Sequence, residues 1–297
     1  NKIVRDAAIK HIPVSGTFEL TTRCNLRCKM CYVCQIINDK TIMERERSAK
    51  EWINMGEQAR DAGMYYLLLT GGEVFIRPDF KEIYQEFSKM GLQINIYSNA
   101  TMITPSVAKW LAKIPPYKIS ITLYGSSPET YCKVTGFADG YQRAVNGIDN
   151  LLAEGIRTGI RTTVVKGNEK EFYELAEFAE KRNIGLGVVN YIGPRRDDGN
   201  TDPIDNRLAP EELIDYELNV VNYNRYKKEK VTTVDDSDST EDNRSNSAIE
   251  TEKQVNAYRC NAGKCNFWIS WDGNMYPCGA YDKPVTYPFD SGFKHSW

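Results

Sequence analysis

Histidine is scarce in this sequence, with only His11 and His295 among 297 residues. Two imidazoles this far apart in the chain are too few to complete a zinc site. The formal net charge of -2 provides no basic field, so we predict no binding to nucleic acid. No apolar run reaches the roughly 20 residues that a membrane helix needs. The first residues, NKIVRDAAIKHIPV, also lack the apolar core of a signal peptide, so we predict a cytoplasmic protein without membrane contact.

Hydrophobic residues nonetheless make up 41% of the sequence, which is enough for a packed core. A length of 297 residues suits one large α/β domain, or one domain with a small appendage. The sequence does not begin with methionine, and we expect it to be part of a longer gene product.

The eight cysteines are grouped along the chain rather than spread through it. There is a group near each end and one cysteine between them: Cys24, Cys28, Cys31 and Cys34; Cys260, Cys265 and Cys278; and Cys132. Tight grouping without a secretion signal favours metal binding over disulfide bonds and agrees with a reducing compartment.

Short apolar runs alternate with segments of helical spacing over the first two thirds of the chain. The expected strands are 17–20, 65–70, 93–97, 118–124, 157–165 and 185–191. The expected helices are 48–62, 79–90, 105–113, 140–153 and 170–181. Such alternation indicates parallel strands with right-handed crossovers. Because a full barrel has eight units, six units predict a partial (β/α)6 TIM-like barrel in the α/β class.

The pattern changes after residue 193. We expect a helix over 211–226, a polar acidic loop over 235–246, and a β-hairpin whose turn contains Asp272-Gly273. The predicted organisation is a lead-in at 1–13, a barrel at 14–194, a linker or insertion at 195–257, and a small hairpin domain at 258–297.

The first cysteine group, in TTRCNLRCKMCYVC, follows the first strand and so lies where barrel enzymes place their chemistry. Cys24, Cys28 and Cys31 supply three thiolates, which leave one iron of a four-iron cluster without a protein ligand. An open coordination site is typical of a catalytic metal centre. The residues alone leave a zinc knuckle open as an alternative. Cys34 has no place in this pattern and is interpreted as a structural thiol.

The C-x3-C-x2-C spacing followed by tyrosine resembles the radical S-adenosylmethionine (SAM) superfamily. That resemblance implies a [4Fe-4S] cluster whose open iron binds SAM, and reductive cleavage of SAM to a 5'-deoxyadenosyl radical. Gly71, Gly72 and Glu73 are similar to the family's GGE motif, in which glycines admit a close backbone approach and the carboxylate accepts from the SAM ammonium group. Further SAM contacts implied by the resemblance are Met30, Ser98, Asn99, Ser120 and Arg161.

The second cysteine group resembles the start of a SPASM or twitch domain, which holds auxiliary [4Fe-4S] clusters. Cys260, Cys265 and Cys278 are the implied ligands, with a structural zinc site as the alternative. No cysteine follows Cys278, so we expect further ligands from a missing C-terminal segment, or a cluster with three thiolates. Cys132 is a weak candidate for a thiol that returns a hydrogen atom to the substrate, and otherwise a small buried side chain.

The resemblance implies an enzyme that modifies a peptide by cross-linking, epimerisation or oxidation, with a reductant such as flavodoxin or ferredoxin. Two alternatives stay open: a twitch-type enzyme that acts on a small molecule, and a non-catalytic zinc or iron–sulfur protein.

Overall fold

The computed structural model describes residues 2–33, 35–196, 201–232, 260–281 and 283–297. The chain divides into two units, Asn1–Arg207 with Asn261–Trp297, and Leu208–Cys260. In the second unit, α9 (Pro210–Thr232) extends beyond the predicted helix. The predicted acidic loop at 235–246 lies outside the described residues. None of the described helices has the length and hydrophobicity needed to cross a membrane.

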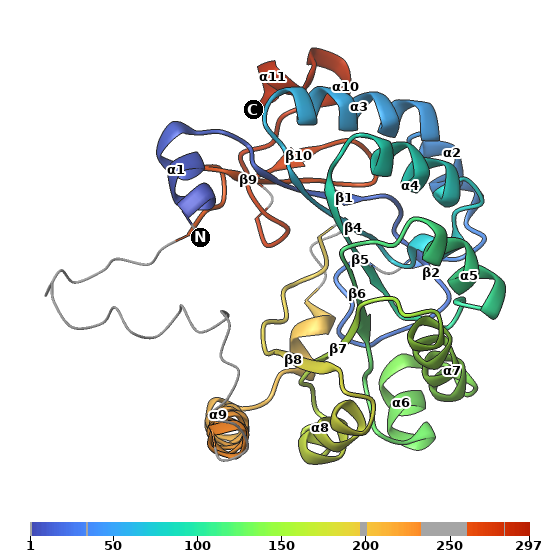
Figure 1. Ribbon diagram of the computed structural model, residues 1–297, viewed down its shortest axis with the longest axis vertical. Helices are drawn as coiled ribbons and strands as arrows, with labels where there is room; N and C mark the ends of the chain where they lie inside the picture. Colours follow the sequence, from blue (N-terminus) through green and yellow to red (C-terminus); the bar gives the residue numbers. More distant parts are fainter. Residues whose placement is uncertain (1, 34, 197–200, 233–259, 282) are drawn as a thin grey trace, which may run out of the picture. The chain divides into compact units, whose positions relative to one another are not determined.

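Six parallel strands form the centre of the first unit (Figure 1). They are β1 (Ser15–Glu19), β4 (Tyr66–Thr70), β5 (Gln93–Ser98), β6 (Lys118–Thr122), β7 (Thr158–Thr163) and β8 (Gly185–Val189). Each pairs with the next in that order, and the sheet is not closed because β8 forms one of its edges. The predicted partial barrel of six βα units is confirmed.

Helices that connect these strands cover one side of the sheet (Figure 1). They are α3 (Ala49–Asp61), α4 (Phe80–Lys89), α5 (Pro105–Lys113), α6 (Pro128–Thr135), α7 (Gly140–Ala153) and α8 (Phe172–Lys181). Ser48 begins α3 with a capping box, in which its hydroxyl accepts from Glu51 N and the Glu51 carboxylate accepts from Ser48 N. Along β6, Ile119 and Ile121 are buried in the core, while the alternate residues of this strand are half-buried.

The C-terminal hairpin pairs with the barrel sheet, and the predicted domain at 258–297 stays a prediction. β9 (Asn266–Ile269) pairs in parallel with β1, and β10 (Met275–Tyr276) pairs antiparallel with β9. Phe267 packs into the main core, and a Cβ on Gly16 would lie 2.5 Å from its ring. Burial of this aromatic side chain between sheet and helices explains why the hairpin is continuous with the barrel. The first unit also extends past the predicted boundary at 194.

Several short elements have no counterpart in the sequence prediction. They are α1 (Lys2–Lys10), α2 (Lys40–Arg45), α10 (Pro288–Ser291), α11 (Phe293–Ser296), the single-turn helices η1 (Val74–Ile76) and η2 (Asp202–Asn206), and the two-residue strands β2 (Arg23–Cys24) and β3 (Gln35–Ile36). All of these except α1 have six residues or fewer, which carry too little periodicity to be recognised from sequence.

Candidate active site

A cavity of about 740 Å³ lies within the first unit, at the carboxyl ends of the parallel strands. It collects most of the residues predicted for the site: Cys24, Cys28, Met30, Cys31, Gly71, Gly72, Ser98, Asn99, Arg161 and Cys278. Glu73, Ser120, Cys132 and Cys265 do not line it, and Cys260 belongs to the second unit. Ten of the predicted site residues thus line one cavity, and their roles in binding stay predictions.

The three cysteines of the first group lie on a single loop, whose base is closed by the parallel pairing of β2 with β3. Cys24 is buried, Cys28 and Cys31 are half-buried, and all three line the cavity. In the described part of the chain, no three metal-ligating side chains are close enough together to enclose an ion. Three thiols that share a cavity wall are the donor set of an iron–sulfur cluster, which is larger than one ion. Cys34 lies outside the described residues.

Asn99 connects the end of β5 to the first cysteine. Its Nδ2 atom donates to Cys24 Sγ at 3.7 Å and to Asn25 Oδ1 at 3.0 Å. The backbone N–H of Leu26 also donates to Cys24 Sγ, at 3.4 Å. These two donors fix the position of the Cys24 sulfur at the cavity wall.

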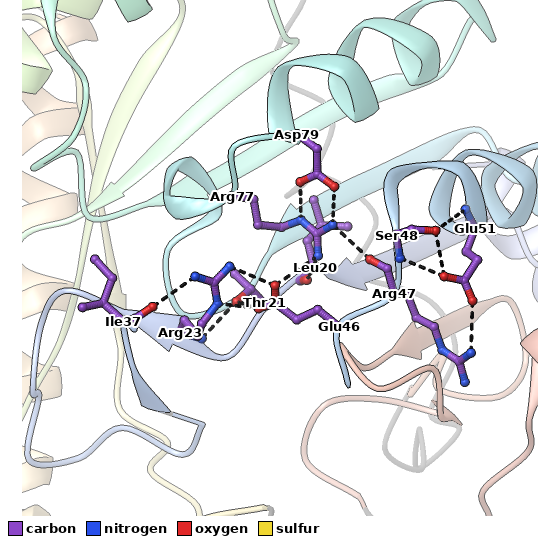
Figure 2. A network of polar contacts seen from close by, with 10 residues as sticks. All are labelled: Leu20, Thr21, Arg23, Ile37, Glu46, Arg47, Ser48, Glu51, Arg77 and Asp79. Atoms are coloured by element: carbon purple, nitrogen blue, oxygen red, sulfur yellow. Dashed lines mark hydrogen bonds and ion pairs between the residues drawn. The ribbon is translucent and has the colours of Figure 1, made fainter. Parts of the chain in front are cut away.

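Buried charges hold the base of the cysteine loop in place (Figure 2). Glu46 accepts from both Nε and Nη2 of Arg23, at 2.8 and 2.9 Å, and also accepts from the Thr21 hydroxyl. Arg77 Nη1 lies 3.6 Å from Glu46 Oε2, and Arg77 donates to both carboxylate oxygens of Asp79 at 2.9 and 2.7 Å. The side chains of Arg23, Glu46 and Arg77 are only 5%, 7% and 3% exposed. Salt screens such buried pairs much less than surface pairs.

This network joins the two sequence motifs. Arg23 comes directly before Cys24, while Arg77 follows the glycine motif and donates to the carbonyl of Leu20 at 2.8 Å (Figure 2). The carboxylate of Glu46 lies between the two guanidinium groups. Its charge therefore fixes the cysteine loop relative to the loop that carries Gly71 and Gly72.

Both glycines of the motif pack against the backbone that leads into the cysteine loop. Gly72 N donates to Thr21 O at 2.7 Å, and Glu73 N donates to Arg23 O at 2.9 Å. A Cβ on Gly71 would collide with the carbonyl of Thr21, and one on Gly72 with that of Arg23. Close approach of two loops thus requires these glycines, in addition to any approach by a ligand.

Glu73 is buried, with 1% of its surface exposed, and its carboxylate faces the end of β5 instead of the cavity. It accepts from Asn99 N at 2.7 Å, Ser98 Oγ at 2.9 Å and Phe75 N at 3.2 Å. Burial raises the pKa of this carboxyl to about 7, although the hydrogen bonds act in the opposite direction. The expected contact between this carboxylate and the SAM ammonium group stays a prediction.

On β6, the cavity-lining residue is Thr122 and not Ser120. The two share one face of the strand, but Thr122 lies closer to its carboxyl end and pairs in register with Arg161 of β7. The guanidinium of Arg161 lies 4.2 Å from the ring centroid of Tyr97, which also lines the cavity. The alternation of β6 could have indicated Thr122, whereas nothing in the sequence pairs Tyr97 with Arg161.

Several other cavity residues were missed by sequence analysis: Tyr32, Tyr124, Tyr191, Arg195, Arg196 and Trp268. Burial raises the pKa of Tyr32 and Tyr124 above the ordinary value of 10, so these phenols stay neutral. Tyr32 directly follows the last cysteine of the motif, which is a local signal. Tyr124 follows β6, and the others come from the loop after β8 and from β9, where the sequence offers no recognisable motif.

The cysteines of the second group lie in different surroundings. Cys278 lines the cavity, whereas Cys265 is fully buried beside Ala7 and Val14 and its Sγ donates to Val4 O at 3.7 Å. Burial raises the pKa of the Cys265 thiol. Cys260 is exposed in the second unit. Their joint role as cluster ligands stays a prediction.

Cys132 lies on α6 and is half-buried, outside the cavity wall. This position gives no support to its predicted role as a hydrogen donor.

Comparison with known proteins identifies the class that the fold and the cavity define. Residues 18–179, more than half of the chain, match the family model of the radical SAM superfamily, and the chain belongs to this family. The family implies SAM and a [4Fe-4S] cluster as cofactors.

Curated relatives act on substrates of more than one kind. The AdoMet-dependent heme synthase of Methanosarcina barkeri is 28% identical over 184 residues, which are 62% of this chain and 51% of that protein. The PqqA peptide cyclase of Rhizobium meliloti is 29% identical over 184 residues, which are 61% of this chain and 48% of the relative. The chain thus spans about half the length of the curated relatives it matches.

Among solved structures, Streptococcus suis SuiB bound to the precursor peptide SuiA has a TM-score of 0.73 and 17% sequence identity. The match covers 100% of this chain and 68% of that chain. This likeness shows a shared fold.

Proposed function

We propose that this chain reductively cleaves SAM and uses the resulting radical to modify a peptide. The observation that carries the proposal is a single cavity that holds all three cysteines of the motif together with Gly71 and Gly72. Bound cofactors would supply a 5'-deoxyadenosyl radical that removes a hydrogen atom from the substrate. The chain itself supplies ligands, orientation and a wall that excludes water.

The proposal assigns a task to several residues of the cavity lining. Cys24, Cys28 and Cys31 hold the cluster. Arg161 offers its guanidinium fork to the carboxylate of SAM, while its stacking on Tyr97 limits its movement.

The remaining contacts position the nucleoside part of SAM. Met30 packs beside the adenine, and Ser98 and Asn99 lie at the strand end proposed for the ribose. Glu73 acts indirectly, because its carboxylate orients Ser98 and the backbone of Asn99.

An auxiliary [4Fe-4S] cluster with Cys260, Cys265 and Cys278 among its ligands is the second part of the proposal. The position of Cys278 in the cavity wall supports it, since an electron acceptor there would lie beside the substrate. A flavodoxin or ferredoxin in the cytoplasm would supply the reducing electron. We retain residues 258–297 as a functional module for this cluster, although they share the sheet of the barrel.

A peptide substrate is favoured by relatives such as the PqqA peptide cyclase. The second candidate is a small-molecule substrate, which the match to the AdoMet-dependent heme synthase supports at similar identity. The two candidate substrate classes can be separated with a pool of deuterium-labelled short peptides and small carboxylic acids. The substrate is the molecule whose deuterium is transferred to 5'-deoxyadenosine.

Anaerobic purification followed by reduction with dithionite tests the reaction class. We expect a brown protein that converts SAM to methionine and 5'-deoxyadenosine. A colourless zinc protein that leaves SAM intact would refute the proposal and favour a non-catalytic metal protein.

A further inference from the structure

Arginine is the one charged residue type among the described residues that line the cavity. Arg161, Arg195 and Arg196 contribute guanidinium groups, and the lining contains no aspartate, glutamate, lysine or histidine. These three guanidinium groups lie in a wall of thiols, glycines and aromatic rings, and they differ in the acceptor that each one meets.

Arg196 already has its anion within the protein. Its Nη2 atom donates to the carboxylate of Glu19, which is fully buried at the end of β1. Its backbone N–H donates to Tyr32 O at 3.0 Å, and its guanidinium lies 5.9 Å from the ring centroid of Trp268. Arg196 thus connects β1, the cysteine loop and the hairpin, and its charge is compensated.

Arg161 has a different environment, on the side of the cavity formed by β5 to β7. It pairs in register with Thr122 and stacks on Tyr97. The proposed function assigns this guanidinium to the carboxylate of SAM. SAM carries one carboxylate, so it accounts for one of the two remaining arginines.

Arg195 is the third arginine of the cavity lining, and neither Glu19 nor SAM pairs with it in this assignment. Its Nε atom is buried and has no hydrogen-bond partner, and no ion pair involves this residue among the described parts of the chain. A buried donor without an acceptor destabilises the folded protein, and it does so more strongly in a charged group. The guanidinium fork matches the geometry of a carboxylate, which accepts two parallel N–H bonds.

We propose that Arg195 binds a carboxylate of the substrate, so that the enzyme selects an acidic side chain or a terminal carboxylate. This inference rests on the proposed function, because it assigns Arg161 to SAM. It adds a determinant of specificity: the ion pair fixes which part of the substrate lies beside the cysteine loop.

The test uses three peptides and the reconstituted protein with SAM, kept anaerobic and unreduced so that no chemistry occurs. Ac-Gly-Glu-Gly-NH2 carries a side-chain carboxylate, Ac-Gly-Gln-Gly-OH a terminal one, and Ac-Gly-Gln-Gly-NH2 none. Equilibrium dialysis with mass spectrometry measures the three affinities. We expect at least one acidic peptide to bind about tenfold more tightly than the neutral one, as for a charge-assisted hydrogen-bonded pair. The acidic peptide that binds better identifies the source of the carboxylate.

Arg195→Gln should remove most of this preference, and Arg195→Lys should restore part of it because the charge remains. Arg157→Gln is the matched control: Arg157 is exposed just before β7 and stacks on Tyr117 at 4.7 Å, outside the cavity lining. The control should keep the full preference.

Equal binding of all three peptides, no binding of any of them, or a preference that survives Arg195→Gln would overturn the inference. SAM cleavage by the unmodified protein under dithionite is measured separately. A protein that cleaves SAM without preferring acidic peptides refutes this inference alone, whereas failure to cleave SAM refutes the proposed function.

Discussion

The two cysteine groups differ in how the fold holds them. The N-terminal loop has all three motif cysteines on one cavity wall, and the buried carboxylate of Glu46 fixes its base. In the C-terminal group, the hairpin directs Cys278 to the cavity, whereas Cys265 is buried against α1. Because the first group lies on one preformed loop while Cys265 and Cys278 point to different surroundings, we expect the two groups to respond differently to mutation.

The largest expected effect separates the two groups by activity. Cys28→Ala should abolish formation of 5'-deoxyadenosine, because the cluster that supplies the electron loses a ligand. Cys278→Ala should retain some uncoupled cleavage of SAM. Chromatography of dithionite-reduced reactions measures both, with circular dichroism to confirm folding. Complete loss in both folded variants would mean that the groups do not have separate roles.

Removal of the Glu46 charge should cost the most stability. Glu46→Ala leaves the buried Arg23 without its anion, whereas Arg77 keeps Asp79, and we expect a loss of about 3 to 5 kcal/mol in the free energy of unfolding of the apoprotein. Urea denaturation measures it. Glu86→Gln is the control, because Glu86 pairs with Lys89 on the surface and should cost less than about 1 kcal/mol. Similar losses in the two variants would contradict a special role for the buried network.

Glu73 should make stability depend on pH. Its pKa rises from the ordinary value of 4.5 to about 7 on folding, so the folded apoprotein loses stability as the pH rises from 4.5 to 7. Glu73→Gln lacks this loss. As the pH rises, the unfolding free energy of the variant should therefore increase relative to that of the unmodified protein by on the order of 3 kcal/mol. Denaturation at pH 5 and pH 8 measures it.

Glu51 provides a control of opposite sign. Its hydrogen bonds with Ser48 and Arg47 lower the pKa of its carboxyl although partial burial opposes them, so it stabilises the folded state above its unfolded pKa. The Glu51→Gln variant should therefore become less stable relative to the unmodified protein as the pH rises. A shift of the same sign for both variants would exclude this account of Glu73.

The smallest effect concerns Cys265. Cys265→Ala removes a buried sulfur, and we expect the apoprotein to lose about 1 kcal/mol of stability. If this thiol ligates an auxiliary cluster, as proposed, the iron content of the reconstituted protein should fall as well. Cys132→Ala should leave the iron content unchanged. Unchanged iron in the folded Cys265→Ala variant would limit this cysteine to a packing role.

Sequence reasoning was reliable where the chemistry is local. Two local motifs, the spacing of Cys24, Cys28 and Cys31 and the run Gly71–Gly72, indicated residues that line the cavity. Each motif lies at the end of one strand. The same holds for α5 and α7, whose ends coincide with the predicted ones. Helical periodicity and capping residues are encoded within a few positions.

Contacts between distant segments could not be predicted. The orientation of Glu73 depends on Ser98 and Asn99, which belong to the next strand. The pairing of β9 with β1 joins opposite ends of the sequence, and no local pattern specifies such a partner. Arg195 looks like a surface residue in the sequence and gains its environment only from the assembled cavity.

The position of β1 between β4 and β9 has a consequence for the order of folding. During synthesis, β4 becomes available soon after β1, whereas β9 leaves the ribosome only after β4, β5, β6, β7 and β8 have been made. Until then β1 is an unprotected edge on a half-assembled sheet, exposed to mispairing. The wall that carries Trp268 and Cys278 is therefore made after the six parallel strands, and the nascent cysteine loop stays accessible to cluster assembly before that wall is added.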